Sequence, residues 1–182
     1  MEDGAAMTKN GHITLVTGGA RSGKSALAER LVARHGGPRI YIATAQAGDA
    51  EMAERIQLHQ RRRNDAWTTI EAPHDLAGAL RASDGQGVRL VDCLTLWLSN
   101  CLGSADFGAL VATLRQQCCP VVLVTNELGL GIVPDNALAR RFRDQHGWMN
   151  QAVGDIADEV WISVSGQPLR LKPMRESPDE II

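Results

Sequence analysis

Residues 13–25 read Ile-Thr-Leu-Val-Thr-Gly-Gly-Ala-Arg-Ser-Gly-Lys-Ser, and this segment is the strongest indication of the fold class. A short apolar run ends at Gly18, four residues follow, and Gly23 then begins a Gly-Lys-Ser triplet. This spacing is the Walker A motif, in which loop N–H groups and the start of the next helix hold phosphates. Lys24 should reach the β- and γ-phosphates, and the Ser25 hydroxyl should ligate Mg²⁺. The predicted nucleotide-binding loop comprises Gly18, Gly19, Ala20, Arg21, Ser22, Gly23, Lys24 and Ser25.

The composition indicates one ordinary globular domain. The chain has 182 residues, of which 44% are hydrophobic and 22% charged, enough for one well-buried α/β core. A net charge of −2 and a pI near 6.2 give no basic footprint for nucleic acid. The start is acidic without a signal-like apolar segment, and no apolar run approaches a membrane span. We therefore expect a cytoplasmic protein with no nucleic-acid partner and no membrane span.

The four cysteines indicate reduced thiols. Cys93, Cys101, Cys118 and Cys119 contain no Cys-x-x-Cys spacing. Neither a zinc site nor a disulfide framework is expected from this pattern.

Strand and helix patterns alternate along the chain, which is typical of a parallel sheet with crossover helices. The fold class predicted is α/β, a P-loop (RecA-like) mainly parallel sheet with helices on both faces. The single domain covers 12–172, between loose tails at 1–11 and 173–182. Strands are predicted at 12–17, 39–43, 88–92, 120–125, 159–164 and 168–172. Helices are predicted at 25–35, 50–63, 75–82, from 95, at 106–119, and from Asp135 or Asn136 to about 157.

Two acids follow buried strands. Asp92 ends the run Val-Arg-Leu-Val and fits a Walker B acid that orients Mg²⁺; the alternative is an N-cap for the next helix. Glu127 follows the apolar strand at 120–125. It could orient the metal, act as a base, or simply be solvated in its loop. In parallel sheets, both acids would lie at the ligand-binding edge.

His59 lies on the predicted helix 50–63, in phase with the apolar Met52 and Ile56. Arginines flank it on either side, including the run Arg61, Arg62 and Arg63. A neutral imidazole there could attack an α-phosphate while the arginines stabilise the developing charge. From spacing alone, a hydrogen-bonded histidine in the core is a more common interpretation of this pattern than a nucleophile.

Several further strings resemble one family, the bifunctional adenosylcobinamide kinase / adenosylcobinamide-phosphate guanylyltransferases of cobalamin biosynthesis. The resemblance runs in order from about residue 13 to 172. It rests on GGARSGKS at 18–25, YIAT at 41–44, DAEM at 49–52 with RI at 55–56, VDCLTLW at 91–97, TNELGLGIVP at 125–134, FRD at 142–144, NQ at 150–151 and VSGQPL at 164–169. The string at 125–134 is far more specific than the Walker A motif.

This resemblance implies two reactions that use ATP or GTP with Mg²⁺ on a corrinoid substrate. The aminopropanol hydroxyl of adenosylcobinamide is phosphorylated, and GTP then guanylylates a histidine that passes GMP to the new phosphate. It implies a homotrimer, His59 as nucleophile and Lys24 as the second catalytic residue. It also implies that nucleotide or metal contacts come from Thr44, Ala45, Gln46, Arg61, Arg62, Arg63, Glu71 and Asp92.

Some family members carry two adjacent histidines where this chain has Leu58 and His59. If the nucleophile maps to the first of the pair, then either His59 substitutes for it or guanylylation is impaired. A simple P-loop kinase without nucleotidyl transfer is therefore the first rival, and a non-enzymatic nucleotide switch is the second. Core positions are expected for all four tryptophans: Trp67, Trp97, Trp148 and Trp161.

Overall fold

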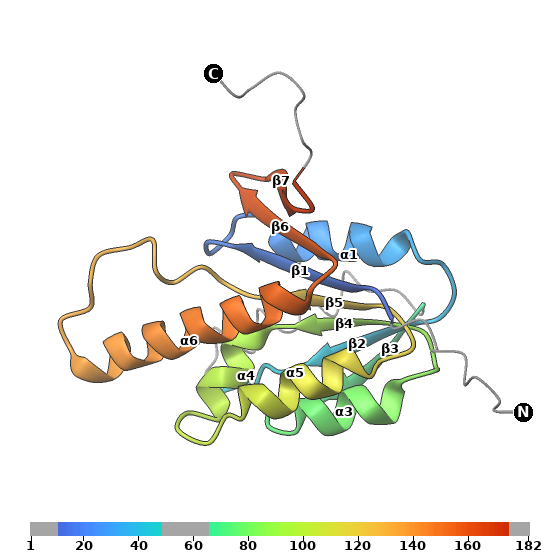
Figure 1. The fold of residues 1–182 in the computed structure, drawn as a ribbon, viewed down its shortest axis with the longest axis horizontal. Coiled ribbons are helices and arrows are strands. Elements are labelled where there is room, and N and C mark those ends of the chain that lie inside the picture. Colours follow the sequence, from blue (N-terminus) through green and yellow to red (C-terminus); the bar gives the residue numbers. More distant parts are fainter. Residues whose placement is uncertain (1–10, 49–65, 175–182) are drawn as a thin grey trace, which may run out of the picture.

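The computed structural model describes residues 11–48 and 66–174, which form a seven-stranded sheet in the order β3-β2-β4-β5-β1-β6-β7 (Figure 1). All neighbouring strands are parallel except β6 and β7, which are antiparallel. The predicted mainly parallel α/β fold is confirmed. The strands are β1 (Ile13–Gly18), β2 (Arg39–Ala43), β3 (Trp67–Glu71), β4 (Val88–Asp92), β5 (Val121–Val124), β6 (Glu159–Val164) and β7 (Gln167–Lys172).

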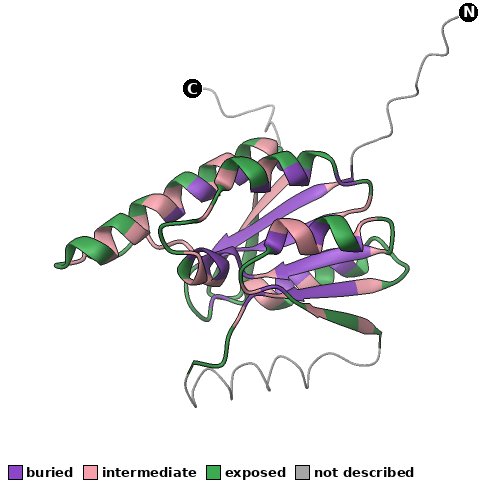
Figure 2. Ribbon diagram, turned by 90° about the horizontal axis from the view of Figure 1, so that it is seen from below, coloured by how far each residue is buried: buried purple, intermediate pink, exposed green. Residues whose placement is uncertain are grey.

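Helices cover both faces of the sheet, as predicted (Figure 1). Helix α1 (Lys24–Ala33) packs on one face; α3 (Leu76–Ser83), α4 (Leu94–Asn100), α5 (Phe107–Arg115) and α6 (Ala137–Ile156) lie on the other. Successive side chains of a strand point to opposite faces. Leu15 of β1 therefore joins the core beneath α3–α6, whereas Val16 joins the core beneath α1. The central strands are accordingly buried on both faces (Figure 2).

Side-chain caps begin three of these helices. Asp75 accepts a hydrogen bond from the Gly78 N–H at 2.8 Å and caps α3. Of the two residues predicted to cap α6, Asn136 does so, accepting from the Ala139 N–H at 2.7 Å. Asp106 caps α5 in the same way. In the described residues, no helix is both long and apolar enough to span a membrane.

Helix α5 is shorter than the predicted span 106–119, because it ends at Arg115. The N–H groups of Cys118 and Cys119 leave the helical pattern and donate to the Asp84 carboxylate, at 2.9 and 3.1 Å. This contact turns the chain into β5 and could not be inferred from the local sequence. All four cysteines are free thiols.

Strand β3 was not predicted. Its sequence Trp-Thr-Thr-Ile-Glu has no clear alternation, and both threonines are exposed. Pairing with β2, from Arg39 opposite Trp67 to Ala43 opposite Glu71, makes it a strand. The aromatic and β-branched content was the available signal. The pairing matters for function because it carries Glu71 to the carboxyl edge of the sheet.

Candidate active site

The strand register brings most of the described candidate residues to one edge of the sheet. Ala43 at the end of β2 pairs with both Glu71 and Asp92, and Asp92 pairs with Val124 at the end of β5. Strand β5 in turn pairs with β1, which leads into the loop 18–25. The predicted helix 50–63, with Asp49, His59 and Arg61, Arg62 and Arg63, lies outside the described residues.

The phosphate-binding loop has the backbone shape that its glycines permit. Gly18 has a φ of 149° and Gly23 a φ of 92°, in the region that side chains disfavour. A Cβ atom at Gly18 would lie 2.5 Å from the Ser163 carbonyl oxygen and 2.6 Å from Ser22 Oγ. Helix α1 begins directly after Gly23, so its N-terminal N–H groups face the loop.

A hairpin distant in sequence supports this loop. The Ser22 carbonyl accepts from Ser163 Oγ at 2.7 Å and from the Gly166 N–H at 3.0 Å. Ser165 and Gly166 both have positive φ, at 51° and 79°, as the tight turn joining β6 and β7 requires. The sequence gives no local signal that this turn would reach the phosphate loop.

Lys24 and Asp92 lie on neighbouring parts of this edge. Lys24 Nζ donates to the Gly19 carbonyl oxygen at 2.9 Å. Burial lowers the pKa of Lys24, while the nearby groups of Cys93 and Asp92 oppose that shift. The strand order β4-β5-β1 brings the end of β4, and with it the Asp92 carboxylate, to the same edge of the sheet as the phosphate loop.

Asp92 is not an N-cap, because the N-cap of α4 is Cys93 and makes no side-chain cap bond. The Tyr41 hydroxyl instead donates to Asp92 Oδ2 at 3.1 Å and orients the carboxylate. Mg²⁺ favours oxygen donors and needs only one or two from the protein when phosphates supply others. The Ser25 hydroxyl and the Asp92 carboxylate are oxygen donors of this kind at the same edge of the sheet. In 11–48 and 66–174, no group of three or more His, Cys, Asp or Glu residues could hold a metal.

Thr44 connects the ends of β2 and β4. Its side chain is fully buried, and Oγ1 both donates to the Cys93 carbonyl and accepts from the Cys93 N–H, each at 2.7 Å. The Thr44 hydroxyl thus fixes the backbone of Cys93, the residue that follows Asp92. Ala45 is half-buried, whereas Gln46 and Glu71 are exposed at the same edge.

Glu127 is held at the base of the phosphate loop. Its N–H donates to the Gly18 carbonyl at 3.1 Å, and its Oε2 accepts from Thr17 Oγ1 at 3.1 Å. Because β5 lies between β1 and β4, this acid stands between the Walker A loop and Asp92 in the sheet order. Glu127 is half-buried and bonded, so it is more than a solvated loop residue.

A buried polar network lies behind Glu127. His146 Nε2 lies 2.9 Å from Thr95 Oγ1 and 3.2 Å from Thr125 Oγ1. Thr125 Oγ1 donates to Asn150 Oδ1 at 2.8 Å. The N–H of Asn126 donates to Thr95 Oγ1, and its carbonyl accepts from Asn150 Nδ2, both at 3.0 Å. The residue before Glu127 is therefore fixed at both its backbone donor and its acceptor.

His146 is 1% exposed, and this burial lowers its pKa to about 4 from an ordinary value of 6.5. As pH falls below 6.5, the unfolded chain takes up a proton that the folded chain refuses, so stability falls. Between pH 7 and pH 5, this residue should cost about 2 kcal/mol of unfolding free energy. Urea unfolding of the wild type and of His146→Gln at both pH values checks this: the variant should lose about that much less on acidification. Equal losses would contradict it.

The tryptophans only partly meet the expectation of core positions. Trp97 is 5% exposed and donates from Nε1 to the His74 carbonyl. Trp67 and Trp161 are half-buried and pack against the core beneath α1. Trp148 is 62% exposed on α6, so the core prediction is wrong for this residue. Helical spacing alone does not reveal which residues of a long, half-exposed helix face the sheet.

A Walker A loop, an acid at the end of β4 and an inserted strand between them define a P-loop nucleotide-binding protein. Comparison with known proteins specifies the group. The chain belongs to the family described as cobinamide kinase / cobinamide phosphate guanyltransferase, whose model matches residues 14–171.

Three curated relatives are bifunctional adenosylcobalamin biosynthesis proteins. CobP of Pseudomonas aeruginosa is 48% identical over 166 residues, covering 87% of this chain and 96% of its own. CobU of Salmonella typhimurium is 42% identical and CobU of Escherichia coli 39%, each covering 87% of this chain and 98% of its own. The resemblance predicted from the sequence motifs is confirmed.

Proposed function

We propose that this chain phosphorylates the aminopropanol hydroxyl of adenosylcobinamide and then transfers GMP from GTP to the new phosphate, giving adenosylcobinamide-GDP. Family membership supports both reactions. The proposal depends chiefly on the phosphate loop 18–25, where Lys24 donates to the Gly19 carbonyl and the sheet order brings Asp92 to the same edge. One such loop can serve both reactions if different phosphorus atoms of the triphosphate are attacked.

In the kinase step, ATP or GTP presents its γ-phosphorus to the acceptor hydroxyl. The N–H groups of residues 18–25 and the Lys24 ammonium hold the phosphates and neutralise developing charge. Ser25 and Asp92 would hold Mg²⁺, which supplies further charge neutralisation to the phosphate oxygens when bound. Phosphoryl transfer depends mainly on such positioning and electrostatics.

In the guanylyltransferase step, His59 attacks the α-phosphorus of GTP. A bond from imidazole nitrogen to phosphorus forms, the bond to the α,β-bridging oxygen breaks, and pyrophosphate leaves with the electron pair. The phosphate oxygen of the corrinoid then displaces His59 and takes GMP. We assign Arg61, Arg62 and Arg63 to phosphate contacts. Ala45, Gln46 and Glu71 are assigned to guanine, ribose or metal contacts, and the fully buried Thr44 supports them indirectly by holding the Cys93 backbone next to Asp92.

The resemblance further supports a cytoplasmic homotrimer as the working form. The relatives are bacterial biosynthetic proteins. The corrinoid substrate, GTP and ATP are the small-molecule partners in this proposal.

Mass spectrometry of the purified protein after incubation with GTP and Mg²⁺ tests the guanylyl-histidine. We expect a mass increase equal to one GMP, which fragmentation places on His59. The adduct should disappear on mild acid treatment and survive base, as a phosphorus–nitrogen bond to histidine does. Absence of any adduct would favour the simple P-loop kinase.

A further inference from the structure

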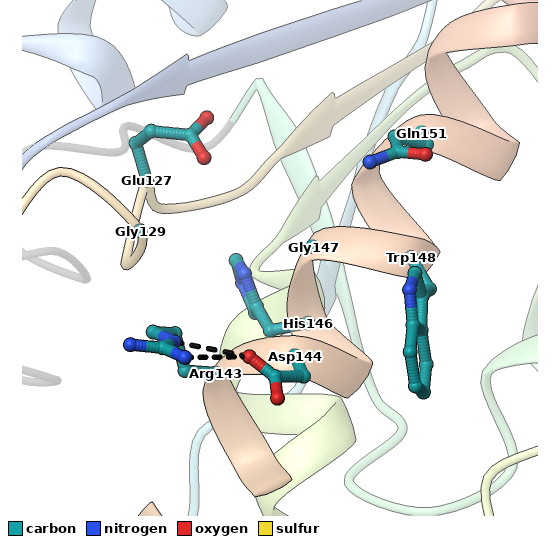
Figure 3. Close-up of a pocket in the computed structure, with 8 residues that line it drawn as sticks. All are labelled: Glu127, Gly129, Arg143, Asp144, His146, Gly147, Trp148 and Gln151. Atoms are coloured by element: carbon teal, nitrogen blue, oxygen red, sulfur yellow. Dashed lines mark hydrogen bonds and ion pairs between the residues drawn. The ribbon is translucent and has the colours of Figure 1, made fainter. Parts of the chain in front are cut away.

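A groove lies between the loop that follows β5 and one side of α6. Glu127 and Gly129 line it from the loop, and α6 contributes residues between 143 and 151 that include His146 and Trp148. Figure 3 shows the two loop residues across from the labelled side chains of the helix. The groove holds about 260 Å³, which is below the range typical of pockets that enclose a whole drug-sized ligand.

This groove adjoins the phosphate loop through Glu127. The same residue that lines the groove is bonded to Thr17 and Gly18, where the phosphate loop begins. Behind it, the network of His146, Thr95, Thr125 and Asn150 fixes the backbone of Asn126. A carboxylate is therefore held rigidly between the phosphate loop and the groove.

Large apolar side chains are exposed on the same loop and on α6. Leu130 is 81% exposed, Ile132 97%, Val133 63% and Trp148 62%. Exposed apolar side chains on two neighbouring elements indicate a surface for binding. A flat ring system with apolar faces would fit such a surface, with a narrow polar arm entering the groove.

We propose that the groove receives the hydroxyl-bearing arm of the corrinoid substrate, whose ring rests on this apolar rim, and that Glu127 is the general base of the kinase step. The inference rests on the proposed function. A groove of this small volume is sufficient in this arrangement, because only the hydroxyl-bearing arm of the corrinoid has to enter it.

The acceptor hydroxyl oxygen forms a bond to the γ-phosphorus, and the bond to the β,γ-bridging oxygen breaks. The nucleoside diphosphate leaves with that electron pair, and the hydroxyl proton passes to the Glu127 carboxylate. Positioned proton acceptors contribute about 10²- to 10⁴-fold to such rates.

Glu127→Gln tests the base, because the amide oxygen can still accept from Thr17 while the side chain can no longer take the proton. With adenosylcobinamide and γ-labelled ATP or GTP, we expect kcat to fall about 10²- to 10⁴-fold. Glu127→Asp keeps a carboxylate and should lose less. Glu29→Gln, on α1, serves as the matched control and should retain the wild-type rate. A Glu127→Gln rate within threefold of wild type would overturn the assignment.

Trp148→Ala tests the rim. We expect the KM for adenosylcobinamide to rise roughly tenfold, with the KM for the nucleotide unaffected. An unchanged KM for adenosylcobinamide would overturn the proposal. A loss of the native oligomer on sedimentation would also overturn it, because the rim would then be a contact with a second copy of the chain. Formation of the GMP adduct by the wild type requires only GTP and Mg²⁺ in the proposed function. If the wild type formed no adduct, the guanylyltransferase proposal would fail, whatever the corrinoid KM of Trp148→Ala.

Discussion

Lys24→Ala is expected to lower both the kinase rate and the rate of GMP-adduct formation by about 10²- to 10³-fold. The reason is that a single phosphate loop serves both reactions, and Lys24 is the lysine of that loop, at the edge of the sheet where Asp92 also lies. Without it, developing charge on either phosphorus loses its closest positioned ammonium. Labelled phosphoryl transfer and intact-protein mass spectrometry measure the two rates separately.

Lys172→Ala provides the control for this experiment. Lys172 also donates to backbone carbonyls, those of Gly154 and Asp155, but it lies on β7. We expect this variant to keep both rates. Circular dichroism should show native folding for both lysine variants. If the Lys24 variant retained kinase activity, the role of the loop in phosphoryl transfer would be refuted.

His59→Ala is expected to abolish the GMP adduct and to lower adenosylcobinamide-GDP formation by more than roughly 10³-fold. Phosphorylation of adenosylcobinamide should continue, because the acceptor hydroxyl attacks the γ-phosphorus without a protein nucleophile. Radiolabel in the γ-position reports the first reaction, and label in the α-position reports the second.

Because Leu58 precedes His59, the loss or persistence of the adduct in His59→Ala decides whether His59 is the nucleophile. A leucine precedes His59 where some family members have a second histidine. An adduct that persisted in His59→Ala would locate the nucleophile at another residue. His35→Ala, which alters an exposed histidine beyond the end of α1, should leave the adduct in place.

The elements with strong local patterns were predicted well. Strands β2 and β4 were predicted to the residue, and Asp92 was placed at a strand end beside the phosphate loop. These features depend on short-range periodicity and on one motif, which the sequence carries directly. Strand β3 was missed because its five residues become a strand by pairing with β2.

The candidate site likewise contains residues that a local sequence pattern predicts and residues that it does not. The sequence singled out the loop 18–25, Asp92, Glu127 and His59 by motif and spacing. It gave no sign that Ser163 and Gly166 would support the loop, since they lie some 140 residues from Ser22. It also placed Trp148 in the core, whereas this residue is exposed beside the groove.

The sequence alone was enough to predict a P-loop fold with a mainly parallel sheet and membership of the cobinamide kinase / cobinamide phosphate guanyltransferase family. The phosphate-loop motif and the alternation of strands and helices depend on residues that are close in sequence, so they can be recognised without the structure. Only the folded chain shows that Glu127 lies between the phosphate loop and a groove, next to the Asn126 backbone that the buried His146 network holds. That placement depends on contacts among β1, β5, α4 and α6, and burial of polar groups between distant segments has no local sequence signal.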